Sequence, residues 1–144
     1  MHEINPSVKF FLNLGKTQTI LTHRFDRGLN GLGFSEFLIL FHLDQAENKK
    51  MRRVDLAEKI GMTASGITRM LLPMEKIGLV KSGPAETDAR VRFVMIANGG
   101  KKKLDEAVER IEILAEEIIP ANKIKEIENF SDLLLEIGGR ALMS

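Results

Sequence analysis

A run of small and polar side chains followed by an arginine occupies residues 63–69, in the sequence TASGITR. Hydroxyl and guanidinium groups hydrogen-bond the edges of bases, and small residues let a backbone approach those edges closely. Because Thr63 is a good helix N-cap, this run would form the exposed first turns of a helix that begins there. The residue types and their order therefore predict a surface that contacts bases. The predicted contacts are Thr63, Ala64, Ser65, Gly66, Thr68 and Arg69.

The cations in and before this run have two interpretations each. Arg69 is predicted to contact a guanine edge or a phosphate, and the alternative is an ion pair with a helix neighbour such as Glu75. A basic run at residues 49–53 lies at the start of another short predicted helix, over about residues 53–60. Its members Arg52 and Arg53 are predicted to contact phosphates, which would give a salt-dependent contribution to binding. The alternative is a solvated loop, because cations at a helix N-terminus oppose the helix dipole.

Charge is unevenly distributed along the chain. The 144 residues have a formal net charge of only +1. Residues 49–92 contain 10 basic and 5 acidic side chains, a net charge of +5. Residues 1–48 (4 basic, 5 acidic) and 93–144 (7 basic, 10 acidic) carry net charges of −1 and −3. A basic zone between acidic segments is what phosphate binding at one face requires, and random clustering of surface charge is the alternative.

Two short helices and a β-hairpin are predicted within the basic zone. Apolar periodicity indicates helices over about 53–60 and 63–77, with Gly61 in the turn between them. Short apolar runs at 79–81 and 91–95 flank a stretch of turn-forming residues, which predicts a two-stranded hairpin. A helix-turn-helix followed by such a hairpin is a winged helix-turn-helix.

Amphipathic helices are predicted on both sides of this lobe. They cover about residues 7–29, about 98–119 and about 122–137, with Pro120 between the last two. In the second of them, apolar residues recur at alternating spacings of 4 and 3, which is typical of a narrow seam against another helix. So much apolar helix surface predicts a symmetric dimer. The seam consists of Leu104, Val108, Ile111, Ala115 and Ile118.

The order of these pieces resembles a known family. The segment VDLAEKIGMTASGITRMLLPMEKIGLV resembles the helix-turn-helix of the MarR family of bacterial regulators and its exit into the wing. The matching pieces are Leu56-Ala57-Glu58, Thr68-Arg69 and Gly78-Leu79-Val80. Asp88-Ala89-Arg90 resembles the family's wing motif of aspartate, any residue and arginine. The flanking helices follow the same order, so the resemblance covers nearly the whole chain.

The resemblance implies roles in the wing. It implies that Asp88 holds the wing and that Arg90 reaches the minor groove, and the alternative for Arg90 is an ion pair with Asp88 that stiffens the hairpin. Arg92 on the returning strand is predicted to offer a cation to DNA, and the alternative is a side chain in solvent. Many family members have a basic residue just after the first wing strand, where this chain has Ser82 after Lys81. The wing is therefore less basic than usual.

The predicted fold is mainly α (α+β) in one MarR-like subunit over residues 1–144. A winged helix-turn-helix DNA-binding lobe with a two-stranded β-wing covers 34–97, and helical dimerisation regions cover 5–29 and 98–144. The predicted function is a sequence-specific transcriptional regulator, a repressor, that binds double-stranded DNA in the cytoplasm as a homodimer on a near-palindromic operator. The alternatives are a winged-helix protein-interaction module without DNA binding and a small helical ligand carrier or enzyme.

A small-molecule effector is a further expectation from the resemblance. Several phenylalanines lie on the segments that line the effector cleft of the family, and they predict an apolar or aromatic ligand that releases the DNA. The alternative is that these rings belong to the hydrophobic core. The predicted cleft residues are Phe11, Phe25, Phe37 and Phe41.

Other function classes find no support in the sequence. The chain has no cysteine, which excludes disulfides, thiolate metal sites and thiol redox sensing. The three histidines, His2, His23 and His42, lack metal-ligand spacing, and no metal or cofactor is predicted. No glycine-rich phosphate loop or catalytic motif occurs, which predicts a protein that is not an enzyme. No apolar run approaches the roughly 20 residues that span a bilayer, so no membrane partner is expected.

Overall fold

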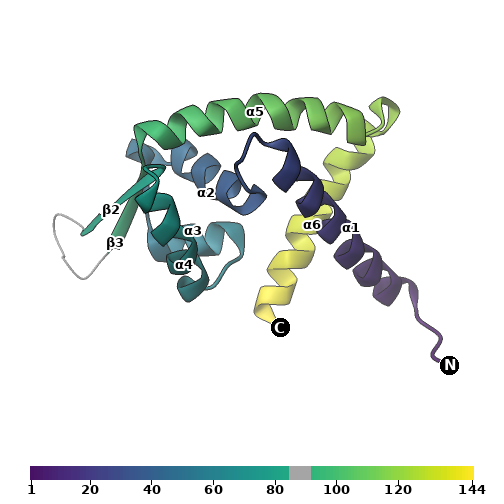
Figure 1. Ribbon diagram of the computed structural model, residues 1–144. Helices are drawn as coiled ribbons and strands as arrows, with labels where there is room; N and C mark the ends of the chain where they lie inside the picture. The colour runs from purple at the N-terminus through teal and green to yellow at the C-terminus, as the bar shows by residue number, and fades with distance from the viewer. Residues whose placement is uncertain (85–91) are drawn as a thin grey trace. The chain divides into compact units, whose positions relative to one another are not determined.

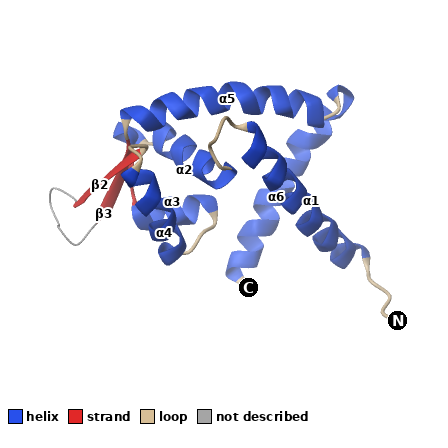
Figure 2. Ribbon diagram, in the orientation of Figure 1, coloured by secondary structure: helices blue, strands red, loops and turns tan. Residues whose placement is uncertain are grey.

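The computed structural model describes residues 1–84 and 92–144. Two predicted wing residues, Asp88 and Arg90, therefore lie outside the described part of the chain. Figures 1 and 2 show the described elements in chain order and by type. The elements are α1 (Pro6–Gly28), α2 (Phe34–Gln45), η1 (Glu47–Lys49), β1 (Lys50–Arg52), α3 (Arg53–Ile60), α4 (Ala64–Lys76), β2 (Val80–Pro84), β3 (Arg92–Ile96), α5 (Asn98–Ile118), η2 (Ala121–Lys123) and α6 (Ile124–Met143).

The described chain forms two compact units, residues 1–111 and 112–144. The first unit contains α1 to α4, the three strands and most of α5, and the second contains the end of α5 together with α6. Most residues are helical, and the strands form a small antiparallel sheet. This composition confirms the predicted mainly α fold with a winged helix-turn-helix.

The turn between α3 and α4 forms where the sequence predicts it. Gly61 adopts the left-handed conformation, with φ of 73°, which a glycine adopts without steric cost. Thr63 then caps α4, because its Oγ1 accepts a hydrogen bond of 3.0 Å from the backbone N–H of Gly66. The helix continues through Pro73 to Lys76, as the apolar pattern predicts. These local signals fix where the exposed turns of α4 begin.

The sheet has one strand more than the predicted hairpin. Its order is β1-β3-β2, and both pairs are antiparallel. Val94 in the central strand pairs with Met51 on one side and with Ser82 on the other. Left-handed conformations at Asn48 and Lys49, both with φ of 58°, precede β1. A strand of three residues is too short to show an alternating pattern, so no periodicity in the sequence indicates it.

The core of the first unit anchors the helix-turn-helix against α2, the sheet and α5. Every buried side chain among the described residues is hydrophobic. Since these side chains come from all the surrounding elements, the orientation of α4 is set by packing as well as by its cap. The core residues with no exposed surface are Ile39, Leu40, Leu43, Leu56, Ile67, Leu71, Met74, Val94 and Ala107.

The helices outside the winged-helix lobe keep much apolar surface exposed. No described residue of α6 is buried, although the helix is amphipathic. In α1 only Gly28, at the C-terminal end, is buried. The large apolar residues that are exposed on these two helices are Val8, Phe11, Leu12 and Ile20 on α1, and Ile124, Ile127, Phe130, Leu133, Leu135, Leu142 and Met143 on α6.

Candidate nucleic-acid interface

The helix α4 has one buried face and one exposed face. The exposed face carries Ser65, Thr68 and Arg69, three of the predicted base contacts. A helix with small polar residues and an arginine in its exposed first turns has the form that enters a major groove. The buried face consists of Ile67, Leu71 and Met74.

Three further predicted contacts lie at the N-terminus of α4. Besides capping the helix, the Thr63 hydroxyl oxygen lies 3.4 Å from the hydroxyl oxygen of Ser65. A β-carbon at Gly66 would meet Thr63 Oγ1 at 3.0 Å and would disturb the cap. Ala64 is exposed. The structure thus gathers all six predicted α4 residues at one end of the helix, where Thr63 and Gly66 also have a structural role.

One exposed residue of the same face was not found by the sequence analysis. Leu72 is 56% exposed and lies one turn beyond Thr68 and Arg69. It is out of phase with the buried positions of α4. An exposed leucine on an otherwise polar helix face was the available signal, because an isolated apolar side chain can contact the methyl group of thymine.

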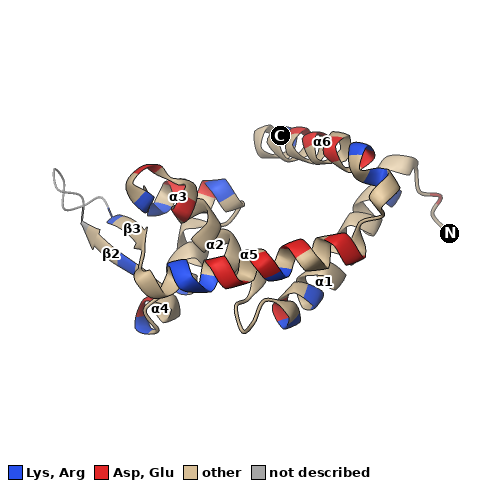
Figure 3. Cartoon of the chain, turned by 90° about the horizontal axis from the view of Figure 1, so that it is seen from above, with Lys and Arg blue, Asp and Glu red and all other residues tan. Residues whose placement is uncertain are grey.

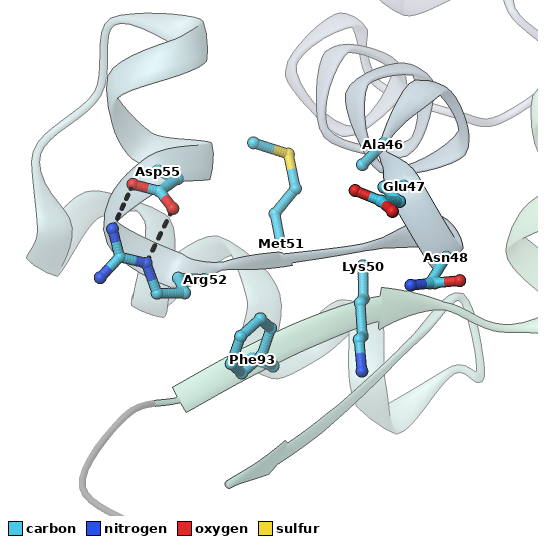
Figure 4. Close-up of a pocket in the computed structure, with 8 residues that line it drawn as sticks. All are labelled: Ala46, Glu47, Asn48, Lys50, Met51, Arg52, Asp55 and Phe93. Carbon is cyan, nitrogen blue, oxygen red and sulfur yellow. Dashed lines mark hydrogen bonds and ion pairs between the residues drawn. The ribbon is translucent and has the colours of Figure 1, made fainter. Parts of the chain in front are cut away.

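Arg52 is paired within the chain. Its Nε and Nη2 donate hydrogen bonds of 2.8 and 3.0 Å to the carboxylate of Asp55, one turn into α3 (Figure 4). The hydrogen bond and the charge of Asp55 raise the pKa of Arg52. Half of the Arg52 side chain is exposed. Its contact with a phosphate stays a prediction, and in such a contact the neighbouring carboxylate would offset part of its charge.

A cavity of about 470 Å³ lies beside this pair, at the junction of η1, β1, α3 and β3 (Figure 4). The Lys50 ammonium lies 5.5 Å from the centre of the Phe93 ring, a cation–π contact. The cavity is lined by equal numbers of cationic and anionic side chains, so its composition favours neither an anion nor a cation. The lining residues are Ala46, Glu47, Asn48, Lys50, Met51, Arg52, Asp55 and Phe93.

Arg53 contacts the other elements of the lobe. Its Nη2 donates a hydrogen bond of 2.9 Å to Ser82 Oγ on β2, and its Nη1 donates one of 3.4 Å to Thr68 Oγ1 on α4. The structure therefore brings two predicted contacts, Arg53 and Thr68, together. It also connects them to the wing through Ser82. From the sequence, Ser82 was noted only because many family members have a basic residue at this position.

The described part of the wing offers further cations. Arg92, the first residue of β3, is exposed and pairs in register with Pro84. Lys81 on β2 is exposed as well. Figure 3 shows cations on both of these strands and charges of both signs on α3, while Asp and Glu recur along α5 beyond its basic start. The role of Arg92 stays a prediction, since its exposure suits both a DNA contact and a side chain in solvent.

The predicted effector-cleft residues separate into two groups. Phe25 stacks on Phe34 at 4.9 Å between ring centres, and the row continues through Phe37 to Phe41 at 6.1 Å for each step. Phe11 instead packs edge-on against Phe10, at 5.6 Å between ring centres. It lies about 21 Å from Phe25 along α1, at 1.5 Å per residue. Phe25, Phe37 and Phe41 therefore belong to one cluster within the chain, and Phe11 does not.

The ionisable groups of the described residues give no sign of a metal centre. No group of three His, Asp or Glu side chains there is arranged to hold a metal ion.

The pKa of His42 lies below its ordinary value because of burial and, to a lesser extent, because of the charge on Lys59. None of the described helices combines the length and the apolar composition that crossing a membrane requires.

The helix-turn-helix, the exposed face of α4 and the antiparallel wing strands define a winged-helix DNA-binding lobe. Residues 34–91 match the model of the MarR family. The winged-helix domain of this chain therefore belongs to the MarR family, whose members regulate transcription and are not enzymes. The winged-helix domain is thus that of a DNA-binding transcriptional regulator, in agreement with the prediction from the sequence.

Solved structures of low sequence identity share the fold over nearly the whole chain. The transcriptional regulator BldR from Sulfolobus solfataricus is similar with a TM-score of 0.82 and 24% identity, covering 97% of this chain and 99% of its own. AbsC, a MarR family regulator from Streptomyces coelicolor, has a TM-score of 0.77 and 20% identity, with 94% and 97% covered. Sco3205, a MarR family regulator from the same organism solved in complex with DNA, has a TM-score of 0.78 and 17% identity, with 94% and 90% covered. No curated protein matches the chain.

Proposed function

We propose that the protein is a repressor that binds a near-palindromic operator through α4 and the wing. The observation that carries this proposal is the exposed face of α4, which carries Ser65, Thr68 and Arg69. The opposite face of the helix is fully buried. The similarity to Sco3205, which was solved with DNA, supports it. Since such a repressor must reach its operator, we place it in the cytoplasm. The predicted DNA contacts are those given for α4, together with Arg52, Arg90 and Arg92, and Asp88 is predicted to hold the wing.

We also propose that the chain acts as a homodimer. The apolar residues on α1 and α6 that remain exposed in one chain support an interface between two copies, because exposed apolar stripes of this extent usually mark association surfaces. A two-fold dimer would present two copies of α4 about one DNA turn apart, roughly 34 Å. The operator would therefore consist of two inverted half-sites.

We propose a small apolar or aromatic molecule as the effector. The row of rings from Phe25 to Phe41 supports this proposal, because Phe41 is 37% exposed and offers an accessible ring at one end of the row. A ligand that binds more tightly to the DNA-free conformation would lower the affinity for DNA by its difference in affinity between the two conformations. The effector would then act as an inducer.

Selection of bound sequences from a random duplex pool tests this function. We expect enrichment of a two-fold symmetric site, and an affinity for it whose logarithm falls with the logarithm of salt concentration by about 0.9 per neutralised phosphate. A duplex with one half-site scrambled serves as the control. Failure to enrich any sequence, with no binding at low salt, would favour the protein-interaction module instead.

A further inference from the structure

Arg53 lies at a junction of three elements of the lobe. It is the first residue of α3 and directly follows β1. Its guanidinium donates to Ser82 on β2 at 2.9 Å and to Thr68 on α4 at 3.4 Å. The second bond is long for a hydrogen bond, so the contact with Ser82 is the stronger of the two. One side chain thus connects the N-terminus of α3 with both predicted DNA-contacting elements.

The sheet places this contact on the inner face of the wing. β1 and β2 flank β3, and the bond from Arg53 to Ser82 links β2 with the first residue of α3, directly after β1. Ser82 pairs directly with Val94, and side chains of directly paired residues point to the same face of a sheet. Because Val94 is fully buried, Ser82 also faces the helices rather than the outer side of the sheet.

The chemistry of the contact suits an arginine. A guanidinium is a rigid planar fork that can donate to two acceptors in fixed directions, which a lysine ammonium on a flexible stem does not reproduce. The Nε of Arg53 is buried and makes no hydrogen bond to any described residue. A buried unpaired donor costs free energy, so the contacts made by the two Nη groups must offset this cost for the side chain to remain in place.

We propose that Arg53 is a positioning residue that fixes the wing relative to α4. This inference rests on the proposed DNA binding, because a winged helix has to place α4 in the major groove and the wing beside it at the same time. A wing that is free to move relative to α4 loses more freedom on binding, and this loss lowers affinity. The role differs from the phosphate contact expected from the sequence, since the guanidinium acts on Ser82 and Thr68 within the chain.

A double-mutant cycle on the selected operator tests the effect on affinity. We expect Arg53→Ala and Ser82→Ala each to raise Kd by about 10-fold, the size of a hydrogen bond to a charged group. The double variant should be no weaker than the weaker single variant. Arg53→Lys should fail to restore affinity. If Arg53 instead binds a phosphate, Ser82→Ala will leave Kd unchanged, Arg53→Lys will retain most of the affinity, and the proposal is overturned.

Hydrogen exchange without DNA tests the contact separately from the proposed function. We expect faster amide exchange in β2 in both Arg53→Ala and Ser82→Ala, with unchanged exchange in the core of α2 as the check that each variant folds. Unchanged exchange in β2 of the folded variants would overturn the inference whatever the DNA measurements give. If the unmodified protein binds no duplex, the proposed function fails, and the exchange result alone decides whether Arg53 holds the wing.

Discussion

Gly100, in the first turn of α5, lies against the main-chain carbonyl oxygen of Leu79 so closely that a β-carbon on residue 100 would overlap it. The same β-carbon would meet Cγ1 of Ile96 at 3.0 Å. The Leu79 oxygen is held in place because it accepts a hydrogen bond of 3.0 Å from the N–H of Ala97. The close contact therefore seats the start of α5 on the segment that leads from α4 into the wing.

Gly100→Ala is expected to destabilise the fold. Overpacking against a main-chain atom that cannot move typically costs about 1–3 kcal/mol, and the loss is measured as the change in the free energy of unfolding in urea. Gly15→Ala is the matched control, because Gly15 is a helical glycine with open space around its α-carbon. That control should be stabilised by up to about 1 kcal/mol. Equal stabilities of the two variants would contradict the packing argument.

Arg69→Ala is expected to weaken operator binding by about 1–3 kcal/mol if the guanidinium contacts a base. The salt dependence separates the two predicted roles, since loss of a phosphate contact would also reduce the salt slope by about 0.9. Binding is measured by fluorescence anisotropy across a salt series. Lys76→Ala, at the other end of α4, is the control. Unchanged affinity of Arg69→Ala would exclude any contact between Arg69 and the DNA.

Leu72 is expected to contact a thymine methyl group. Replacing one thymine of the operator by uracil removes only that methyl, and should cost about 0.8 kcal/mol for one buried methyl-sized group at the contacted position. In Leu72→Ala the same replacement should cost nothing, and the salt slope should stay unchanged. Ile77→Ala, with a side chain that is 68% exposed beyond the end of α4, is the control. A uracil penalty that persists in Leu72→Ala would refute the contact.

The start of α4 and its exposed face could be predicted from local signals in the sequence. Thr63 and Gly61 determine how α4 begins, and the period of its apolar residues determines which face is buried. Because cap, turn and period all act over a few residues, they can be recognised without knowledge of the fold. Leu72 falls outside this apolar period, so the same signal also marks it as exposed, although the residue was given no role from the sequence.

Contacts between distant residues could not be predicted in this way. The bond between Arg53 and Ser82 joins positions 29 residues apart, and it depends on a sheet whose first strand has three residues. In the sequence, Arg53 is one of several cations in a basic run, and Ser82 stands where many family members have a basic residue. Only the order of the strands shows that one side chain reaches the other.

The stability of the lobe is expected to fall in mild acid through His42. Its pKa in the folded chain lies below the ordinary value of 6.5, so the unfolded chain binds more protons as the pH falls below 6.5. The stability is therefore fully present above pH 6.5 and is lost as the pH falls toward the folded-state pKa. Urea unfolding at about pH 7.5 and pH 5 measures this loss. His42→Phe should reduce the pH dependence. An unchanged pH dependence in His42→Phe would assign the effect to other groups.

Ile127→Glu is expected to separate the proposed dimer into single chains. Ile127 and Phe130 are both exposed and lie three residues apart, so they share one face of α6. In the dimer, a carboxylate on that face would be buried in the interface without a partner, which is unfavourable. In a single chain Ile127 is 36% exposed, so the fold should tolerate the change. Sedimentation velocity measures the association state and circular dichroism the helix content. Lys125→Glu, which adds negative charge on the polar face, is the control. Loss of the dimer should weaken operator binding, because each half-site would be bound independently. A dimer that survives Ile127→Glu with unchanged operator affinity would place the interface elsewhere on the chain.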